Sequence, residues 1–160
     1  MSEKAVPKKH VSEPFWQLPL SELDAEQWEA LCDGCAQCCL VKLEDDDNGD
    51  VYHTAVSCQL LEIEQCRCQD YTHRLQRIPD CVQVSLDKPE QFEWMPKTCA
   101  YRLRYEGKAL PEWHPLISGV AESVHEAGIS VKSYAISEQY VHPEQLEDFI
   151  TEKIFSKNKP

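Results

Sequence analysis

The chain has 160 residues, of which 42% are hydrophobic and 28% charged, and its 28 acidic and 16 basic side chains give a net charge of −12. This length is sufficient for one domain with its own hydrophobic core, so folding need not depend on cross-links. The acidic balance argues against a general nucleic-acid or anionic-membrane binder, because both partners repel an acidic surface, and no apolar run is long enough to span a bilayer.

The two ends of the chain are polar and are predicted to be tails. Residues 1–14 have the composition of a disordered segment, and their lysines are not followed by the apolar stretch of a secretory signal. We therefore expect a cytoplasmic protein with a disordered tail at 1–14, a single metal-binding domain at 15–155 and a C-terminal tail at 156–160. Nine cysteines in a reducing compartment indicate metal or redox chemistry rather than a disulfide framework.

The first predicted element is a helix over residues 24–31. Asp24 is a good N-cap residue, and Gln27 follows three positions later, as a capping box requires. Leu23, Trp28 and Leu31 then share one apolar face. The helix leads directly into the most distinctive stretch of the chain.

Four cysteines fall within eight residues in that stretch: Cys32, Cys35, Cys38 and Cys39. Two residues between thiols is the spacing that a tight turn needs to direct two sulfurs at one metal ion, and Gly34 suits a position with positive φ. Cys38 and Cys39 are adjacent, so their side chains should diverge. They either serve two ions, bridge a cluster, or divide into one ligand and one packed thiol.

A hairpin and a second group of cysteines follow. Two β-rich runs, 40–43 and 51–56, flank Asn48-Gly49, which favours a tight hairpin turn. The later cysteines are predicted to lie among turns and one short helix, and they are Cys58, Cys66, Cys68 and Cys81.

The remaining segments predict a mixture of short strands and helices. Residues 82–95 suggest a short strand, a turn at Pro89 and an aromatic stretch, and residues 96–106 suggest a helix ended by Gly107. A strand is predicted near 129–136. A final helix should begin near Pro143, with these apolar residues at helical spacing: Leu146, Phe149, Ile150 and Ile154. The expected fold is therefore α+β, a small irregular domain organised around a cysteine-rich metal site, with a short β-hairpin and flanking helices.

The cysteine pattern resembles the CxxCxxCC family of zinc- or iron-chelating proteins. After the first four thiols, Cys58 matches that family's next cysteine, residues 68–74 match its Cys-x-x-Tyr-x-x-Arg motif, and Cys81 matches its last cysteine. Further motifs resemble the YcgN-like bacterial subfamily, and they lie at 15–16, 79–81, 92–94, 98–102 and 110–116.

The resemblance implies a set of metal-ligating residues. Seven thiols belong to the broad family pattern: Cys32, Cys35, Cys38, Cys39, Cys58, Cys68 and Cys81. Cys66 and Cys99 are added only by the subfamily pattern. Tyr71 and Arg74 would stand beside the ligands, where Arg74 offsets thiolate charge, although a packed tyrosine and a hydrogen-bonded arginine are an equal alternative.

The kind of metal centre follows from the ligands. Seven thiols can divide into a closed site of four and an open site of three, and soft thiolates select zinc, copper(I) or iron–sulfur clusters. The expected cofactor is one or more zinc or iron ions, with an iron–sulfur cluster as the alternative. His53 and His73 lie in the cysteine region and could each complete a site, but a packed or surface histidine is the commoner case.

Three functions are compatible with these residues. The first is a metal-binding protein that sequesters, delivers or senses zinc or iron, with the metal ion as its partner. The second is an iron–sulfur or metal-dependent modifying enzyme, because flagellin lysine N-methylases share a CxxCxxCC region, although no catalytic constellation is recognisable beyond the cysteines. The third is a zinc-stabilised interaction module whose acidic surface meets a basic partner.

Overall fold

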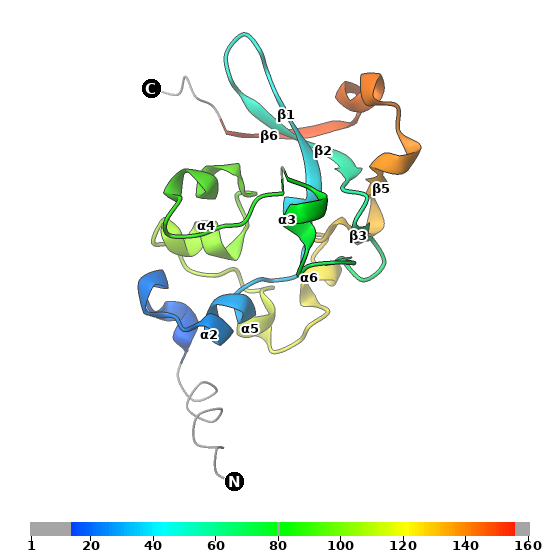
Figure 1. The fold of residues 1–160 in the computed structure, drawn as a ribbon. Coiled ribbons are helices and arrows are strands. Elements are labelled where there is room, and N and C mark those ends of the chain that lie inside the picture. Colours follow the sequence, from blue (N-terminus) through cyan, green and yellow to red (C-terminus); the bar gives the residue numbers. More distant parts are fainter. Residues whose placement is uncertain (1–13, 80, 156–160) are drawn as a thin grey trace.

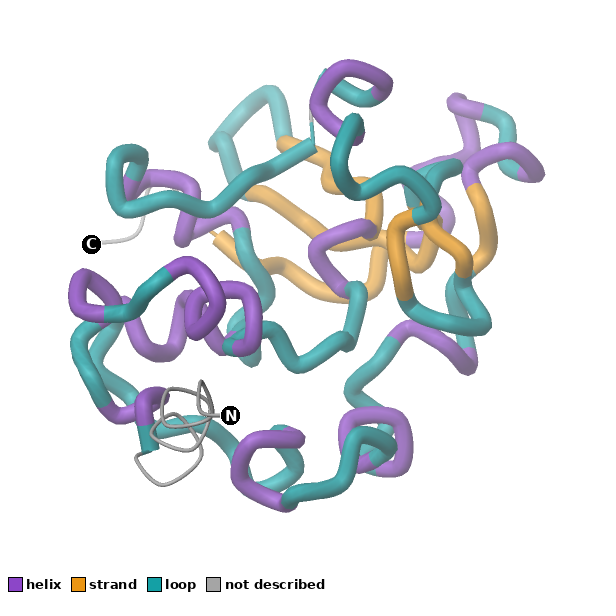
Figure 2. Tube along the Cα trace, turned by 60° about the horizontal axis from the view of Figure 1, so that its bottom comes forward, coloured by secondary structure: helices purple, strands orange, loops and turns teal. Residues whose placement is uncertain are grey.

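The computed structural model describes residues 14–79 and 81–155, and its fold is the predicted α+β type (Figure 1). The predicted tails at 1–14 and 156–160 lie outside the described residues, apart from Pro14. Figure 2 shows the strands gathered together, with helical turns distributed around them. Every helix within the described ranges is too short or too polar to cross a membrane.

The central strand of the main sheet is β2, Val51–Ser57. It pairs antiparallel with β1, Leu40–Glu44, and this is the predicted hairpin, with Gly49 at φ +77° in its turn. Strand β2 also pairs with the antiparallel β6, Ile150–Phe155, and with the short parallel β5, Ile136–Ser137. Strand β2 is paired along both edges, and most of its residues are buried.

The second cysteine region forms a small ribbon and a helix. Strands β3, Leu61–Glu62, and β4, Arg67–Cys68, pair antiparallel, and α3 covers Arg74–Arg77. This agrees with the predicted turns and single short helix.

The predicted helix before the first cysteines is confirmed as α2, Ala25–Ala30. Its capping box is complete: the Gln27 backbone N–H donates to Asp24 Oδ1 at 2.8 Å, and the Asp24 N–H donates to Gln27 Oε1 at 2.9 Å. Two short 3₁₀ turns, Phe15–Gln17 and Leu20–Glu22, precede it.

The middle of the chain differs from prediction in two places. The strand expected after residue 82 is absent from the described structure, where a 3₁₀ helix over Pro89–Trp94 follows irregular chain. Helix α4 covers Ala100–Tyr105 and so begins later than predicted, because Cys99 has the extended backbone of an N-cap residue. It ends as predicted, with Gly107 at φ +79°.

The C-terminal third holds two corrections. The predicted strand at 129–136 is wrong, because the segment after α5, Pro115–Ser118, and α6, Ser123–Glu126, turns into a 3₁₀ helix at Val131–Ser133. Only Ile136 and Ser137 join the sheet, as β5. After a 3₁₀ turn at Glu138–Tyr140, the predicted last helix is a 3₁₀ helix over Pro143–Phe149, and the chain then enters β6.

Two hydrophobic clusters form the core. One contains Leu20, Leu31, Phe92 and Ala100, with Leu23, Trp28 and Tyr101 packed against it. The other contains Ala36, Leu40, Leu61 and Val131. A cavity lies between them, since residues of both clusters line its wall.

Candidate metal centre

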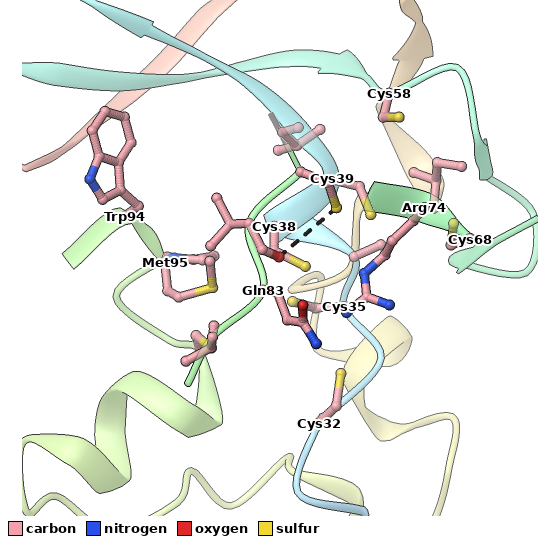
Figure 3. A pocket seen from close by; sticks show the side chains of 18 of the residues that line it. Cys32, Cys35, Cys38, Cys39, Cys58, Cys68, Arg74, Gln83, Trp94 and Met95 are labelled. Atoms are coloured by element: carbon pink, nitrogen blue, oxygen red, sulfur yellow. Dashed lines mark hydrogen bonds between the residues drawn. The ribbon is translucent and has the colours of Figure 1, made fainter. Parts of the chain in front are cut away.

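The cavity between the two clusters has a volume of about 590 Å³, and eight of the nine cysteines line it (Figure 3). Its wall includes all seven thiols of the family pattern, and it also includes Cys99. Cys66 is the remaining cysteine: its Sγ lies 3.6 Å from the Ile63 carbonyl oxygen, outside the cavity wall. Segments far apart in the chain therefore bring their thiols to one place.

The Cys32–Cys35 segment has the backbone of a metal-binding turn. Gly34 has φ +79° and Ala36 has φ +64°. The Gly34 N–H points at Cys32 Sγ and the Gln37 N–H points at Cys35 Sγ, both at 3.4 Å. Backbone N–H groups aimed at sulfur favour the charged thiolate that binds metal. Cys58 shows the same arrangement, with the Leu60 N–H 3.4 Å from its Sγ.

Two side chains fix the end of α2 directly before Cys32. His114 is buried, and its Nε2 lies 2.8 Å from the carbonyl oxygen of Leu31 while its Nδ1 accepts the Leu116 N–H at 3.0 Å. Burial lowers the pKa of His114, which agrees with a neutral ring carrying its proton on Nε2. Tyr101 Oη donates to the Trp28 carbonyl oxygen at 2.6 Å.

The segment around Val131 holds the far side of the same turn. The Val131 N–H donates to the Cys35 carbonyl oxygen at 3.0 Å, and Gln37 Nε2 donates to the Ile129 carbonyl oxygen at 2.6 Å. The segment at 129–136, which was predicted as a strand, instead holds the first cysteines in place through these two hydrogen bonds.

Cys38 and Cys39 do not diverge as far as their adjacency predicts. Both lie in a 3₁₀ turn, Gln37–Cys39, that leaves the two thiols close enough to interact. Interaction with the Cys39 thiol lowers the pKa of Cys38 to about 7, against the effect of burial and with help from the Lys42 ammonium. The same interaction raises the pKa of Cys39. Of these two adjacent thiols, Cys38 is therefore the one that ionises more easily.

Burial holds three of the other cavity thiols in their neutral form. Burial raises the pKa of Cys32 and of Cys99 to about 12, and that of Cys35 well above its ordinary value. Cys32 is exposed to the cavity, yet protein atoms surround it on most sides. Metal binding at these sulfurs must therefore displace protons.

The chemistry of the donors fits zinc or iron. Thiolates are soft ligands that select these metals over magnesium or calcium. In addition, Asp33 is 6% exposed, lines the cavity, and has an Oδ2 atom without a hydrogen-bond partner among the described residues. Within the same residues no three Cys, His, Asp or Glu side chains already converge as a metal site.

Tyr71 and Arg74 both line the cavity. The Arg74 guanidinium carbon lies 3.8 Å from the centre of the Tyr71 ring, and Arg74 Nη1 donates to the Tyr71 carbonyl oxygen at 2.7 Å. Burial raises the pKa of Cys81, and Arg74 opposes that rise. Arg74 is therefore placed to offset thiolate charge, while Tyr71 Oη donates to Glu29 at 3.1 Å.

The two histidines in the cysteine region are not on the cavity wall of the described structure. His53 is buried in β2, and His73 is an exposed side chain paired with Asp70 at 2.9 Å. The sequence did not single out Asp33 or Lys42, although both lie close to the first thiols along the chain. The signal for Asp33 was its place inside Cys-Asp-Gly-Cys.

Comparisons with known proteins identify the family to which the chain is similar. A protein-family model described as "CxxCxxCC: Putative zinc- or iron-chelating domain" matches residues 31–100. The chain is 49% identical to a UPF0260 protein of Ectopseudomonas mendocina over 140 residues, which are 87% of this chain and 94% of the relative. It is 49% identical to a UPF0260 protein of Allorhizobium ampelinum over 140 residues, 87% of this chain and 88% of the relative. A third UPF0260 protein, from Azotobacter vinelandii, is 48% identical over 139 residues, 86% and 93% of the two chains. No solved structure matches the chain.

Proposed function

Because the chain belongs to the UPF0260 family and carries the CxxCxxCC domain, we propose that it is a cytoplasmic protein that binds zinc or iron through cysteine thiolates. The observation that carries this proposal is the gathering of eight thiols around one cavity. Buried thiols behave as small hydrophobes when they only fill space, but these thiols face a void and three of them receive a backbone N–H.

The proposed ligands are the seven thiols of the family pattern, together with Cys99, which shares the cavity wall. Arg74 lies over the Tyr71 ring beside them and offsets the charge that the thiolates build up. Cys66 is excluded from the ligand set because its thiol points at the Ile63 carbonyl oxygen.

A reducing compartment suits this chemistry. All nine cysteines are free thiols in the described ranges. Thiolate sites persist in the cytoplasm, where glutathione and thioredoxin keep thiols reduced. Exposure to an oxidant would instead convert adjacent thiols into disulfides and remove ligands.

The test is purification without air, followed by measurement of zinc, iron and acid-labile sulfide per chain. We expect metal at a fixed ratio to protein; an iron–sulfur cluster adds colour that fades in air, whereas zinc is colourless. The Cys66→Ser variant is the control and should keep its metal. A protein that contains no metal, and that takes up neither zinc nor iron after anaerobic reconstitution, would overturn the proposal.

A further inference from the structure

We propose that the cavity also binds a neutral, planar heteroaromatic molecule beside the thiols, with the Gln83 amide pairing with its polar edge. The inference goes beyond metal binding and rests on the proposed function only for the charge of the cavity. Three observations carry it: the size of the cavity, the apolar side chains at the end away from Cys58 and Cys68, and the place of Gln83.

The cavity is larger than a metal ion needs. In a tetrahedral thiolate site the sulfurs lie about 2.3 Å from the ion, so the ligands themselves enclose it. The cavity has a volume of about 590 Å³, which falls within the range of about 300–1,000 Å³ that is typical of pockets for organic molecules. It therefore has room for an organic ligand beside a metal ion.

Apolar and aromatic side chains form one part of the cavity wall. Figure 3 shows Trp94 and Met95 at the opposite end of the cavity from Cys58 and Cys68. Other lining residues come from the side chains that pack on the Leu31 and Phe92 cluster. Together these residues are called the apolar wall, and they are Trp28, Val84, Trp94, Met95 and Tyr101.

The apolar wall is held in place by bonds within the protein. The Trp28 and Tyr101 ring centres lie 5.1 Å apart, and Tyr101 Oη donates to the Trp28 carbonyl oxygen at 2.6 Å. Met95 is 2% exposed, and its carbonyl oxygen accepts Arg102 Nη1 at 2.8 Å. A wall that is already ordered lowers the entropy cost of binding a ligand.

The composition of the apolar wall favours a planar aromatic ligand. Aromatic rings pack against one another in stacked or edge-to-face pairs, and each pair adds to the free energy of burial. The thioether sulfur of methionine also makes favourable contacts with aromatic rings. Two tryptophans, one tyrosine and one methionine on the same wall therefore suit a flat ring system better than a branched aliphatic molecule.

Gln83 supplies the polar contact. Its side chain is exposed and lines the cavity, so it lies at the opening. Figure 3 shows this side chain between Met95 and Arg74. A side-chain amide donates and accepts hydrogen bonds at once, and a ring with an N–H beside a C=O matches both. The ligand is therefore a heteroaromatic molecule with a lactam-like edge.

The charge of the cavity favours a neutral ligand. Thiols lose their protons when they bind metal, so the metal-loaded cavity holds thiolate charge that repels anions. The two basic side chains on its wall already donate to backbone carbonyl oxygens: Lys42 to Cys38 at 3.2 Å and Arg74 to Tyr71 at 2.7 Å. A cation would lose its hydration against the apolar wall.

Calorimetric titration with carbostyril, a neutral lactam of two fused rings, tests the inference on metal-loaded protein purified without air. Carbostyril should bind saturably, one molecule per chain. Quinoline, which lacks the lactam, should bind more weakly, and the 1-naphthoate anion should not bind.

Three variants locate the site. Gln83→Leu should weaken carbostyril binding by roughly two- to tenfold and leave quinoline binding unchanged. Trp94→Leu should weaken the binding of both molecules. Trp16→Leu is the matched control, because Trp16 lines a different cavity, and it should change neither. Equal weakening in Trp16→Leu and Trp94→Leu, or full carbostyril affinity in Gln83→Leu, would overturn the inference.

Metal measured on the same samples separates this inference from the proposed function. Normal metal content without saturable carbostyril binding would overturn the ligand site alone. So would binding to the metal-free protein only, because the metal centre would then fill the cavity. An unsubstituted protein that holds no metal, even after anaerobic reconstitution, would instead overturn the proposed function, and carbostyril binding to that protein would still support the ligand site.

Discussion

Nε2 of His114 lies 2.8 Å from the carbonyl oxygen of Leu31, the residue directly before Cys32. The same ring accepts the Leu116 N–H at 3.0 Å, so one buried side chain satisfies two backbone groups. Through these two bonds the segment around residue 114, some eighty positions later in the chain, fixes where the first cysteines begin.

Replacing His114 by Phe should destabilise the protein by about 2–4 kcal/mol, because a ring of similar size fills the space but leaves the buried Leu31 carbonyl and the part-buried Leu116 N–H without partners. The free energy of unfolding in urea measures the loss. The matched control is His73→Phe at an exposed histidine, where losing a surface ion pair should change stability by no more than about 1 kcal/mol. Equal losses in the two variants would contradict the anchoring role of His114.

Gly34→Ala should weaken metal binding. Gly34 has φ +79° and open space where a Cβ would lie, so the substitution adds backbone strain of roughly 1–2 kcal/mol without a clash. The turn can relieve that strain only by moving Cys32 and Cys35. Gly107→Ala is the matched control, because Gly107 has the same φ and the same open space at the end of α4, away from the thiols.

Both glycine variants should lose similar stability, as measured by thermal unfolding of the metal-free proteins. Only Gly34→Ala should release metal faster to a competing chelator. A Gly107→Ala protein that loses metal equally fast would show that strain anywhere in the fold, rather than the geometry of the turn, controls release.

Protonation of His53 should make the free energy of unfolding decrease as the pH is lowered. His53 is 2% exposed, and burial, with the charge of Lys42, lowers its pKa from 6.5 to about 4; Lys42 on β1 and Glu152 on β6 are its register partners. Above pH 6.5 the ring is neutral in both states and the protein keeps its full stability. As the pH is lowered from 6.5 to 4, the His53 ring is protonated in the unfolded chain but not in the folded chain. The free energy of unfolding therefore falls by about 3 kcal/mol.

His53→Leu removes this titration while filling a similar volume. The substitution breaks no side-chain hydrogen bond of Nε2 of His53, because that atom has no partner among the described residues. Unfolding in urea at pH 7.5 and pH 5 should show a smaller difference for the variant than for the unsubstituted protein. Identical pH dependence in the two proteins would mean that other groups control acid stability.

Removing the metal should loosen the cysteine-bearing segments before the sheet. Structural thiolate sites contribute binding free energy of roughly 10 kcal/mol or more to folding in small zinc domains, and here the β3–β4 ribbon pairs through two residues on each strand. Hydrogen exchange after chelation should accelerate at residues 32–39 and 58–81. Strand β2 should stay protected because β1 and β6 pair with it; uniform protection throughout would contradict this order of unfolding.

Local chemistry made part of the fold predictable. Asp24 and Gln27 predicted the start of α2 because a capping box acts within one turn. Asn48 and Gly49 predicted the β1–β2 hairpin because its turn needs a positive φ. The gathering of the thiols was predictable from their spacing and from the family resemblance, although the division into tails and one domain stays a prediction.

Other parts of the structure depend on contacts between distant segments and could not be predicted from local sequence patterns. Residues 150–155 have apolar side chains at helical spacing, but the open edge of β2 takes them as strand β6, which suits their β-branched residues. Cys99 stood outside the broad family pattern and reaches the cavity only because α4 packs against Leu31 through Ala100. The buried place of Asp33 depends on the same tertiary packing, so its unpartnered oxygen could not be foreseen.

The β1–β2 hairpin joins Cys39 to Cys58 at its base, where the Cys58 N–H meets the Cys39 carbonyl oxygen at 2.8 Å, and keeps its acidic turn at the opposite end. Those two residues are therefore already neighbours in the backbone before any metal binds, and the intervening chain adds no closure entropy to binding. The turn at Asp46 and Asp47 can accept a fluorophore or an affinity tag. A probe attached at the hairpin turn can therefore report on metal binding without altering the thiols.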